Sequence, residues 1–178
     1  MKITILNGSP RKGNTRDLLK AFMDGAKDAE IDYYNLHETK VAPCEACNSC
    51  TESKGKCKHI DITNEILNSI HNANAIVFGS PVYWWGVTAQ LKAMIDKMYA
   101  FNYQNYQLPH KRVGLIMVGG METNAIQYQL ISSQFKCICE FLNWDFRFSE
   151  AFCADVVGAI KINKEAMEKA KGLFKKLL

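Results

Sequence analysis

The sequence predicts an α/β protein in which a parallel five-stranded sheet is covered by helices on both faces. Five short apolar segments alternate along the chain with segments whose apolar residues recur at helical spacing. This alternation is typical of strands joined by helical crossovers, and such crossovers produce a parallel sheet. Residues 75–79 are continuously apolar, as expected for a central strand buried on both faces. We find no repeat and no linker, so we interpret residues 1–178 as a single domain.

The five strands are expected at residues 2–7, 31–36, 75–79, 111–118 and 145–152. Helices are expected from residue 15, from residue 61, and over 88–100, 124–142 and 164–178. The first helix places four apolar residues on one face: Leu18, Leu19, Phe22 and Ala26. Residues 37–60 form a long polar segment without periodicity. A loop of that length inside a compact domain is usually functional.

Composition excludes several classes of function. The net charge is +4 and no block of Lys and Arg stands out, so nothing indicates a nucleic-acid partner. The first residues read as a strand rather than a signal peptide, and no apolar run approaches the ~18 residues of a membrane span. We therefore expect a cytoplasmic protein. The seven cysteines are expected to be thiols or metal ligands rather than a disulfide framework.

A candidate anion-binding loop follows the first strand, where residues 7–15 read N-G-S-P-R-K-G-N-T. A helix begins directly after this loop, and a helix N-terminus attracts anions through its free N–H groups and its dipole. The loop adds hydroxyl, amide and cationic groups and a flexible glycine: Ser9, Arg11, Lys12, Gly13, Asn14 and Thr15. It is neither a Walker A nor a G-x-G-x-x-G sequence, which argues against a nucleoside triphosphate or a dinucleotide. The alternative is a simple capped turn, with Asn14 or Thr15 as N-cap.

A second candidate loop follows the third strand, where residues 79–88 read G-S-P-V-Y-W-W-G-V-T. Ligands of open α/β sheets bind beyond the carboxyl ends of strands at the switch point, and both loops lie there if the strand order is 2-1-3-4-5. Three consecutive aromatic residues are costly to leave in water, so we expect a flat conjugated ring as their partner. Alternatively, the tryptophans pack in a dimer interface or under a neighbouring loop.

Together with Q-L-K-A-M-I-D at 90–96, these two loops resemble the NADPH-dependent FMN reductase family, and most closely its iron–sulfur flavoprotein branch. The resemblance covers nearly the whole chain and implies a flavodoxin-like three-layer sandwich with strand order 2-1-3-4-5. It implies FMN held by three loops, the third at Gly119 and Gly120, after which Met-Glu-Thr at 121–123 departs from the pattern. The cofactor-binding residues expected are Ser9, Arg11, Lys12, Gly13, Asn14, Thr15, Pro81, Val82, Tyr83, Trp84, Trp85, Gly86, Gly119 and Gly120.

The cysteine-rich loop at 43–58 has the spacing C-x2-C-x2-C-x6-C, formed by Cys44, Cys47, Cys50 and Cys57. Closely spaced thiolates can wrap one compact cluster, whereas zinc sites more often use two separated pairs. The spacing therefore favours a [4Fe–4S] cluster over zinc, and the iron–sulfur flavoproteins carry a similar run. Free thiols are the third alternative. The remaining cysteines are expected to be buried in the core: Cys137, Cys139 and Cys153.

No histidine pairs with Ser or Cys in a hydrolase pattern. We expect His59 to be an exposed loop residue, the alternative being a metal ligand beside Cys57. Asp61 is expected to cap a helix rather than to act as a catalytic carboxylate. No side chain is assigned a catalytic role, because a bound flavin itself carries the redox chemistry.

The resemblance implies an FMN-dependent oxidoreductase, or electron-transfer flavoprotein. Electrons would pass from ferredoxin or NAD(P)H, through FMN and a [4Fe–4S] cluster if one is present, to an acceptor that the sequence does not name. The broader family suggests flavins, quinones or metal ions as acceptors. One alternative is a cluster-free NAD(P)H:FMN or quinone reductase, and another is a non-enzymatic flavodoxin-like electron carrier. A homodimer or homotetramer is expected, with no membrane partner.

Overall fold

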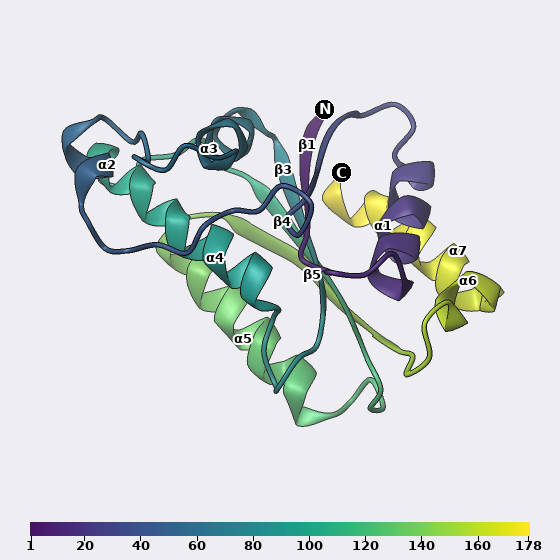
Figure 1. Cartoon of the computed structure of the whole chain (residues 1–178). Coiled ribbons are helices and arrows are strands. Elements are labelled where there is room, and N and C mark those ends of the chain that lie inside the picture. Colours follow the sequence, from purple (N-terminus) through teal and green to yellow (C-terminus); the bar gives the residue numbers. More distant parts are fainter.

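A single parallel sheet forms the centre of the molecule (Figure 1). The computed structural model describes residues 1–178. The sheet has the order β2-β1-β3-β4-β5, which confirms the predicted flavodoxin-like fold. Its strands are β1 (Lys2–Asn7), β2 (Glu30–Asn35), β3 (Ala75–Pro81), β4 (Arg112–Gly119) and β5 (Asp145–Cys153). Every residue of β3 is buried, as expected of a central strand.

Helices cover both faces of the sheet, which completes the three layers (Figure 1). One face carries α1 (Asn14–Gly25), α6 (Ala159–Ile162), α7 (Lys164–Gly172) and the 3₁₀ helix η2 (Leu173–Leu177). The other carries α3 (Thr63–Asn72), α4 (Ala89–Lys97), the 3₁₀ helix η1 (Met98–Gln104) and α5 (Ile126–Phe141). A short helix, α2 (Ser49–Glu52), lies within the cysteine-rich loop.

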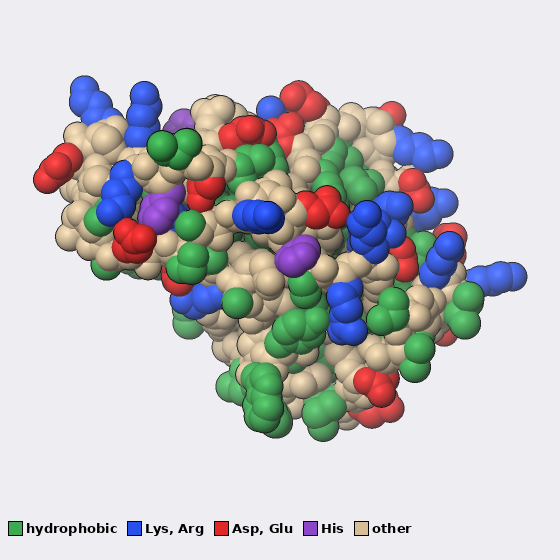
Figure 2. Space-filling view, viewed as in Figure 1, with side chains coloured by type: hydrophobic (Ala, Val, Ile, Leu, Met, Phe, Trp, Pro, Cys, Tyr) green, Lys and Arg blue, Asp and Glu red, His purple; other side chains and the backbone are tan.

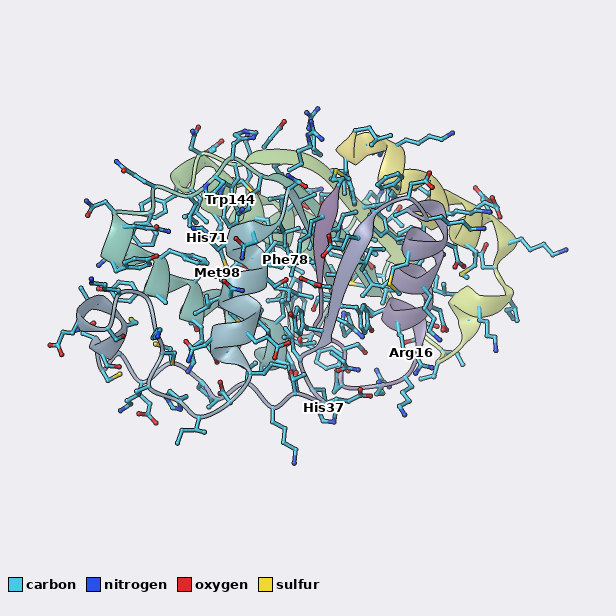
Figure 3. The ribbon with its side chains drawn as sticks, turned by 90° about the horizontal axis from the view of Figure 1, so that it is seen from above. Arg16, His37, His71, Phe78, Met98 and Trp144 are labelled. Carbon is cyan, nitrogen blue, oxygen red and sulfur yellow. The ribbon has the colours of Figure 1, made fainter.

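The sheet separates two hydrophobic cores, because side chains alternate between its faces. On the α1 face Phe22 packs against Phe148, with ring centroids 6.5 Å apart. On the other face Phe78 packs edge-on against Phe135 at 4.9 Å. Figure 3 shows Phe78 and Met98 in the layer that faces α3 and α4, while Arg16 lies with α1 on the opposite side. The four apolar residues predicted to face inward from α1 are all buried.

Several expectations need correction. The expected helix over 88–100 is α-helical only to Lys97 and continues as a 3₁₀ helix to Gln104. The expected helix over 164–178 also ends as a 3₁₀ turn, which is common at helix C-termini. Of the three cysteines expected in the core, only Cys139 is buried. Cys137 is two residues away on α5, so it points to the solvent side, and Cys153 ends β5 and is exposed.

None of the helices combines the length and the apolar character that crossing a membrane requires.

Candidate functional site

The loops at the carboxyl ends of the strands meet around one pocket of about 200 Å³. The loop after β1 contributes Ser9, Arg11, Gly13, Asn14 and Thr15. The loop after β3 contributes Pro81, Val82 and Tyr83, and the end of β4 contributes Val118, Gly119 and Gly120. The structure therefore brings together the three loops that the sequence singled out. Lys12, Trp84, Trp85 and Gly86 do not line this pocket.

A fourth segment, which the sequence did not indicate, closes the pocket. It follows β5 and contributes Ala154, Asp155 and Val157. A Cβ atom added to Gly120 would come within 2.9 Å of Asp155 Oδ1, and one on Gly13 within 3.2 Å of Val157 Cγ1. The two glycines therefore allow this segment to approach closely. No local motif marked it, because only tertiary packing places it here.

The N-terminus of α1 presents free backbone donors to the pocket. Its N-cap is Gly13, which has no side chain to accept a hydrogen bond from the first-turn N–H groups. The alternative capped turn, with Asn14 or Thr15 as N-cap, is therefore wrong. Ser9 and Thr15 are buried beside these donors. The arrangement suits an anion, because the free N–H groups and the helix dipole both favour negative charge.

Asn14 uses its amide to hold the fourth segment. Its Nδ2 donates to the carbonyl of Val156 at 2.9 Å. Its Oδ1 accepts from the N–H of Gly158 at 2.9 Å and from that of Ile160 at 3.3 Å. Asn14 lines the pocket, and its amide is committed to these protein partners.

Further hydrogen bonds join the other loops to one another. Gly8 N–H donates to the carbonyl of Gly79 at 2.8 Å, and Thr88 Oγ1 donates to the carbonyl of Gly8 at 2.7 Å. Arg11 Nη2 donates to the hydroxyl of Tyr83 at 3.3 Å. The candidate anion-binding loop after β1 and the aromatic loop after β3 are therefore hydrogen-bonded to each other and form one wall of the pocket.

The aromatic loop makes a tight turn that points its tryptophans outward. Tyr83 and Gly86 exchange two backbone hydrogen bonds of 3.0 Å. Between them Trp84 and Trp85 have φ angles of +46° and +59°, a conformation that is costly for bulky residues. Trp84 is 90% exposed and Trp85 50%. Figure 2 shows hydrophobic side chains gathered at the lower end of the molecule, where Figure 1 places the loops after β3 and β4.

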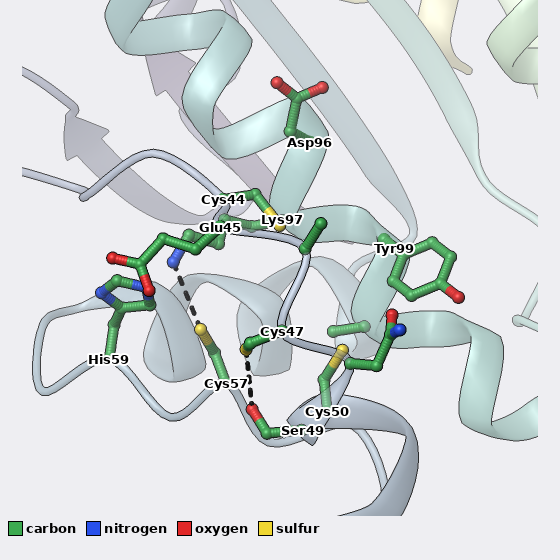
Figure 4. Close-up of a pocket in the computed structure, with 13 residues that line it drawn as sticks. Cys44, Glu45, Cys47, Ser49, Cys50, Cys57, His59, Asp96, Lys97 and Tyr99 are labelled. Carbon is green, nitrogen blue, oxygen red and sulfur yellow. Dashed lines mark hydrogen bonds and ion pairs between the residues drawn. The ribbon is translucent and has the colours of Figure 1, made fainter.

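The cysteine-rich loop forms a second pocket, of about 140 Å³ (Figure 4). The four cysteines of the predicted motif all line it: Cys44, Cys47, Cys50 and Cys57. No group of three or more His, Cys, Asp or Glu side chains is arranged to hold a single metal ion. The thiols thus share one pocket without converging on one point.

Hydrogen bonds fix this loop against α3. Cys57 N–H donates to Asn64 Oδ1 at 2.8 Å, and Asn64 Nδ2 returns a bond to the Cys57 carbonyl at 3.0 Å. Asp61 accepts from the N–H groups of Thr63, at 2.8 Å, and Ala42, at 2.9 Å. The N-cap of α3 is Ile62, so the expectation that Asp61 caps a helix is wrong by one residue. The Asp61 carboxylate instead joins the first residue of α3 to the loop at Ala42.

The side chains that line the cysteine pocket differ in their electrostatic surroundings and in their exposure to solvent. The hydroxyl of Ser49, 3.2 Å from Cys47 Sγ, lowers the pKa of the Cys47 thiol, whereas burial raises the pKa of the Cys50 thiol. His59 was expected to be exposed, but its side chain is only 18% exposed because it lines the pocket. Its buried Nε2 makes no hydrogen bond.

Lys97 also lines this pocket, and the sequence analysis missed it. Its Nζ donates to Cys57 Sγ at 3.2 Å (Figure 4). A signal was present in the sequence, because Lys97 follows Met94 by three residues and so lies on the inward face of α4.

The model of the NADPH-dependent FMN reductase family matches residues 1–137. The chain belongs to this family. The matched range includes both candidate loops and all four cysteines of the pocket, and it ends before the fourth segment. Family membership makes the chain an FMN-dependent oxidoreductase.

Its curated relatives include proteins named iron–sulfur flavoprotein, in agreement with the resemblance to that branch. One, from Methanocaldococcus jannaschii, is 37% identical over 135 residues, which cover 71% of this chain and 69% of the relative. Another, from Methanosarcina thermophila, is 36% identical over 123 residues, which cover 67% and 64%. The match thus spans about two thirds of the length of these relatives.

Among solved structures, the NAD(P)H:quinone oxidoreductase from Methanothermobacter marburgensis superposes with a TM-score of 0.77 at 16% identity. The superposition covers 99% of this chain and 96% of that chain. This structural similarity supports the flavodoxin-like fold of the chain.

Proposed function

We propose that this chain is an electron-transfer flavoprotein that binds FMN in the first pocket and a [4Fe–4S] cluster in the cysteine pocket. Electrons would come from NAD(P)H or a ferredoxin and pass to a small acceptor such as a flavin, a quinone or a metal ion. The observation that carries the proposal is the gathering of all four motif cysteines around one pocket. A single helix, α4, connects this pocket with the aromatic loop, and its nine residues span about 14 Å.

The first pocket fits FMN by its donor set. The free N–H groups of α1, with Ser9, Thr15 and Arg11, would bind the phosphate. Pro81, Val82 and Tyr83, together with Gly119 and Gly120, would hold the isoalloxazine ring. When bound, FMN accepts two electrons and can release them one at a time. We propose that Lys12, Trp84, Trp85 and Gly86 act at the rim, where they do not line the pocket itself.

The cysteine pocket fits a cluster better than a single ion. In a [4Fe–4S] cluster each thiolate bonds a different iron, so the four sulfurs need not converge on one point as they must around zinc. Ser49 favours the thiolate of Cys47. Lys97 Nζ offers N–H donors to an anionic, sulfur-rich group, and the ring of His59 lines the same pocket. When bound, the cluster supplies one-electron transfer.

We further propose a homodimer or homotetramer in the cytoplasm. The exposed Trp84 and Trp85 support the association, because large aromatic side chains in a strained turn are costly to leave in water. The seven free thiols suit a reducing compartment.

The test is an absorption spectrum with iron and sulfide assays on protein purified without oxygen. We expect flavin bands together with about four irons per chain. Cys57→Ser should lose the iron, whereas the control Cys137→Ser, an exposed cysteine outside the cysteine pocket, should keep it. Flavin without iron would instead indicate a cluster-free NAD(P)H-dependent reductase. Failure to bind FMN even on reconstitution would overturn the proposal.

A further inference from the structure

Lys97 is a buried cation at the C-terminal end of α4. It is 3% exposed, in a layer otherwise formed by apolar side chains such as Met94 and Met98. It forms no ion pair with any carboxylate, and its only hydrogen-bond acceptor is Cys57 Sγ at 3.2 Å. The carboxylates of Glu45 and Asp61 lie near enough to interact electrostatically with the Lys97 ammonium, but neither forms an ion pair with it.

This arrangement needs an anion. Lysine is almost never fully buried without a partner, because removing the ammonium from water is costly. A neutral thiol is a weak hydrogen-bond acceptor, whereas a thiolate is a strong one. The hydrogen bond from Lys97 Nζ to Cys57 Sγ is therefore best explained if Cys57 carries its negative charge as a thiolate. The ring of His59 lines the same pocket, with its buried Nε2 3.8 Å from Glu45 Oε2.

We propose that Lys97 sets the reduction potential of the cluster through this charge-assisted hydrogen bond to Cys57. The inference rests on the proposed function, since it requires that the cysteine loop holds a [4Fe–4S] cluster. Reduction adds one electron, and so one negative charge, to the group that the cysteines hold. No bond forms or breaks, and the ammonium keeps its protons. A fixed positive charge in a poorly solvated position stabilises the more negative, reduced state and raises the potential.

Lys97 acts through Cys57 and is therefore a positioning residue. A purely structural role would make a different prediction, namely that removing the charge alters stability but leaves the potential unchanged. The reduction potential is thus the measurement that separates the two roles.

The experiment compares the full-length wild type with Lys97→Met and Lys97→Arg, all purified without oxygen. The matched control is Lys56→Met, which removes an exposed lysine next to Cys57 that makes no bond to a loop sulfur. Iron and sulfide are assayed first, and the potential is then measured by a dye-mediated titration followed by electron paramagnetic resonance. We expect Lys97→Met to become harder to reduce, with a larger shift to negative potential than Lys56→Met. Lys97→Arg should recover most of the shift.

The outcomes are distinguishable. A wild type without iron would overturn the cluster part of the proposed function, and this inference with it. A wild type with iron and an unchanged potential in Lys97→Met would overturn this inference alone. If Lys97→Met fails to retain the cluster, Lys97→Gln, which keeps an N–H donor without the charge, provides the same comparison. Failure of both uncharged variants to hold iron would show that the charge serves assembly, which would also overturn the proposal.

Discussion

Asn14 and Val156 lie 142 residues apart in the sequence and are joined by a hydrogen bond of 2.9 Å from Asn14 Nδ2 to the Val156 carbonyl. The same amide accepts the N–H of Gly158. Asn14 thereby connects the first helical turn of α1 to the segment that carries Asp155 into the pocket. Asn14 is the side chain that holds the far end of this wall, while the N–H of Ala154 donates to the carbonyl of Gly119 at 2.8 Å at its start.

We predict that Asn14→Ala weakens FMN binding roughly 10-fold or more. The change removes hydrogen bonds that contribute about 0.5–1.5 kcal/mol each, and it releases the fourth wall of the pocket. Titration of the apoprotein with FMN, followed by flavin fluorescence, measures the effect. The control Lys20→Ala alters an exposed residue of the same helix and should bind FMN as the wild type does. Equal affinities in Asn14→Ala and the wild type would contradict the role of Asn14.

Gly8→Ala should lower the free energy of unfolding by about 1–3 kcal/mol, because the added methyl group overpacks the site. Its Cβ would lie 2.7 Å from Thr88 Oγ1 and 2.8 Å from Leu91 Cβ, so β1 and α4 must move apart. Urea unfolding measures the change. Gly172→Ala is the matched control, since its Cβ would meet no atom within 4 Å, and it should be neutral or slightly stabilising. Equal stability of the two variants would argue against the close approach at Gly8.

Lys111 is expected to make stability rise with pH in alkaline solution. Burial lowers the pKa of Lys111 from 10.5 to about 8, while its Nζ donates to the carbonyls of His71 and Ala73. Between these two pKa values the unfolded chain binds the proton and the folded chain does not, so raising the pH favours the folded state. From about pH 7.5 to about pH 9.5 the gain is about 2 kcal/mol.

Urea unfolding of the wild type and of Lys111→Met across this range tests the effect. Other groups titrate equally in both proteins. The difference between their free energies of unfolding at each pH therefore isolates the contribution of Lys111. The wild type should gain stability relative to the variant as the pH rises. A difference that stays constant with pH would show that Lys111 keeps its ordinary pKa.

Trp84→Gly should raise the free energy of unfolding by about 1 kcal/mol, because glycine adopts a positive φ without the steric cost of a side chain. Thermal unfolding measures it at a protein concentration low enough to keep the chain monomeric, because the proposed association would otherwise bury the Trp84 ring. Asn105→Gly, at a φ of +51°, should gain less, since asparagine tolerates this conformation. A loss of stability in monomeric Trp84→Gly would contradict the steric cost at this φ angle, whereas a loss seen only at high protein concentration would support the proposed association.

Local patterns were sufficient for much of the fold. The alternation of strands and helices predicted the sheet, and the buried side chains of Leu18 and Phe22 followed from helical spacing. The expectations that needed correction concern the burial of individual side chains, which a short stretch of sequence does not determine. Cys137 and Cys139 lie two residues apart in the same stretch of sequence, and the orientation of α5 against the sheet decides that only Cys139 is buried.

The amino-acid sequence was sufficient to predict the parallel sheet, the two loops at the ends of β1 and β3, and four cysteines spaced to bind one cofactor. Each is encoded within a few residues, by periodicity, by turn chemistry or by ligand spacing. Three contacts follow from the packing of the whole chain: Asp155 closes the first pocket, Asn14 holds its segment there, and Lys97 reaches Cys57. These contacts join residues at least 40 positions apart, and they depend on how the helices pack across the sheet rather than on any local preference.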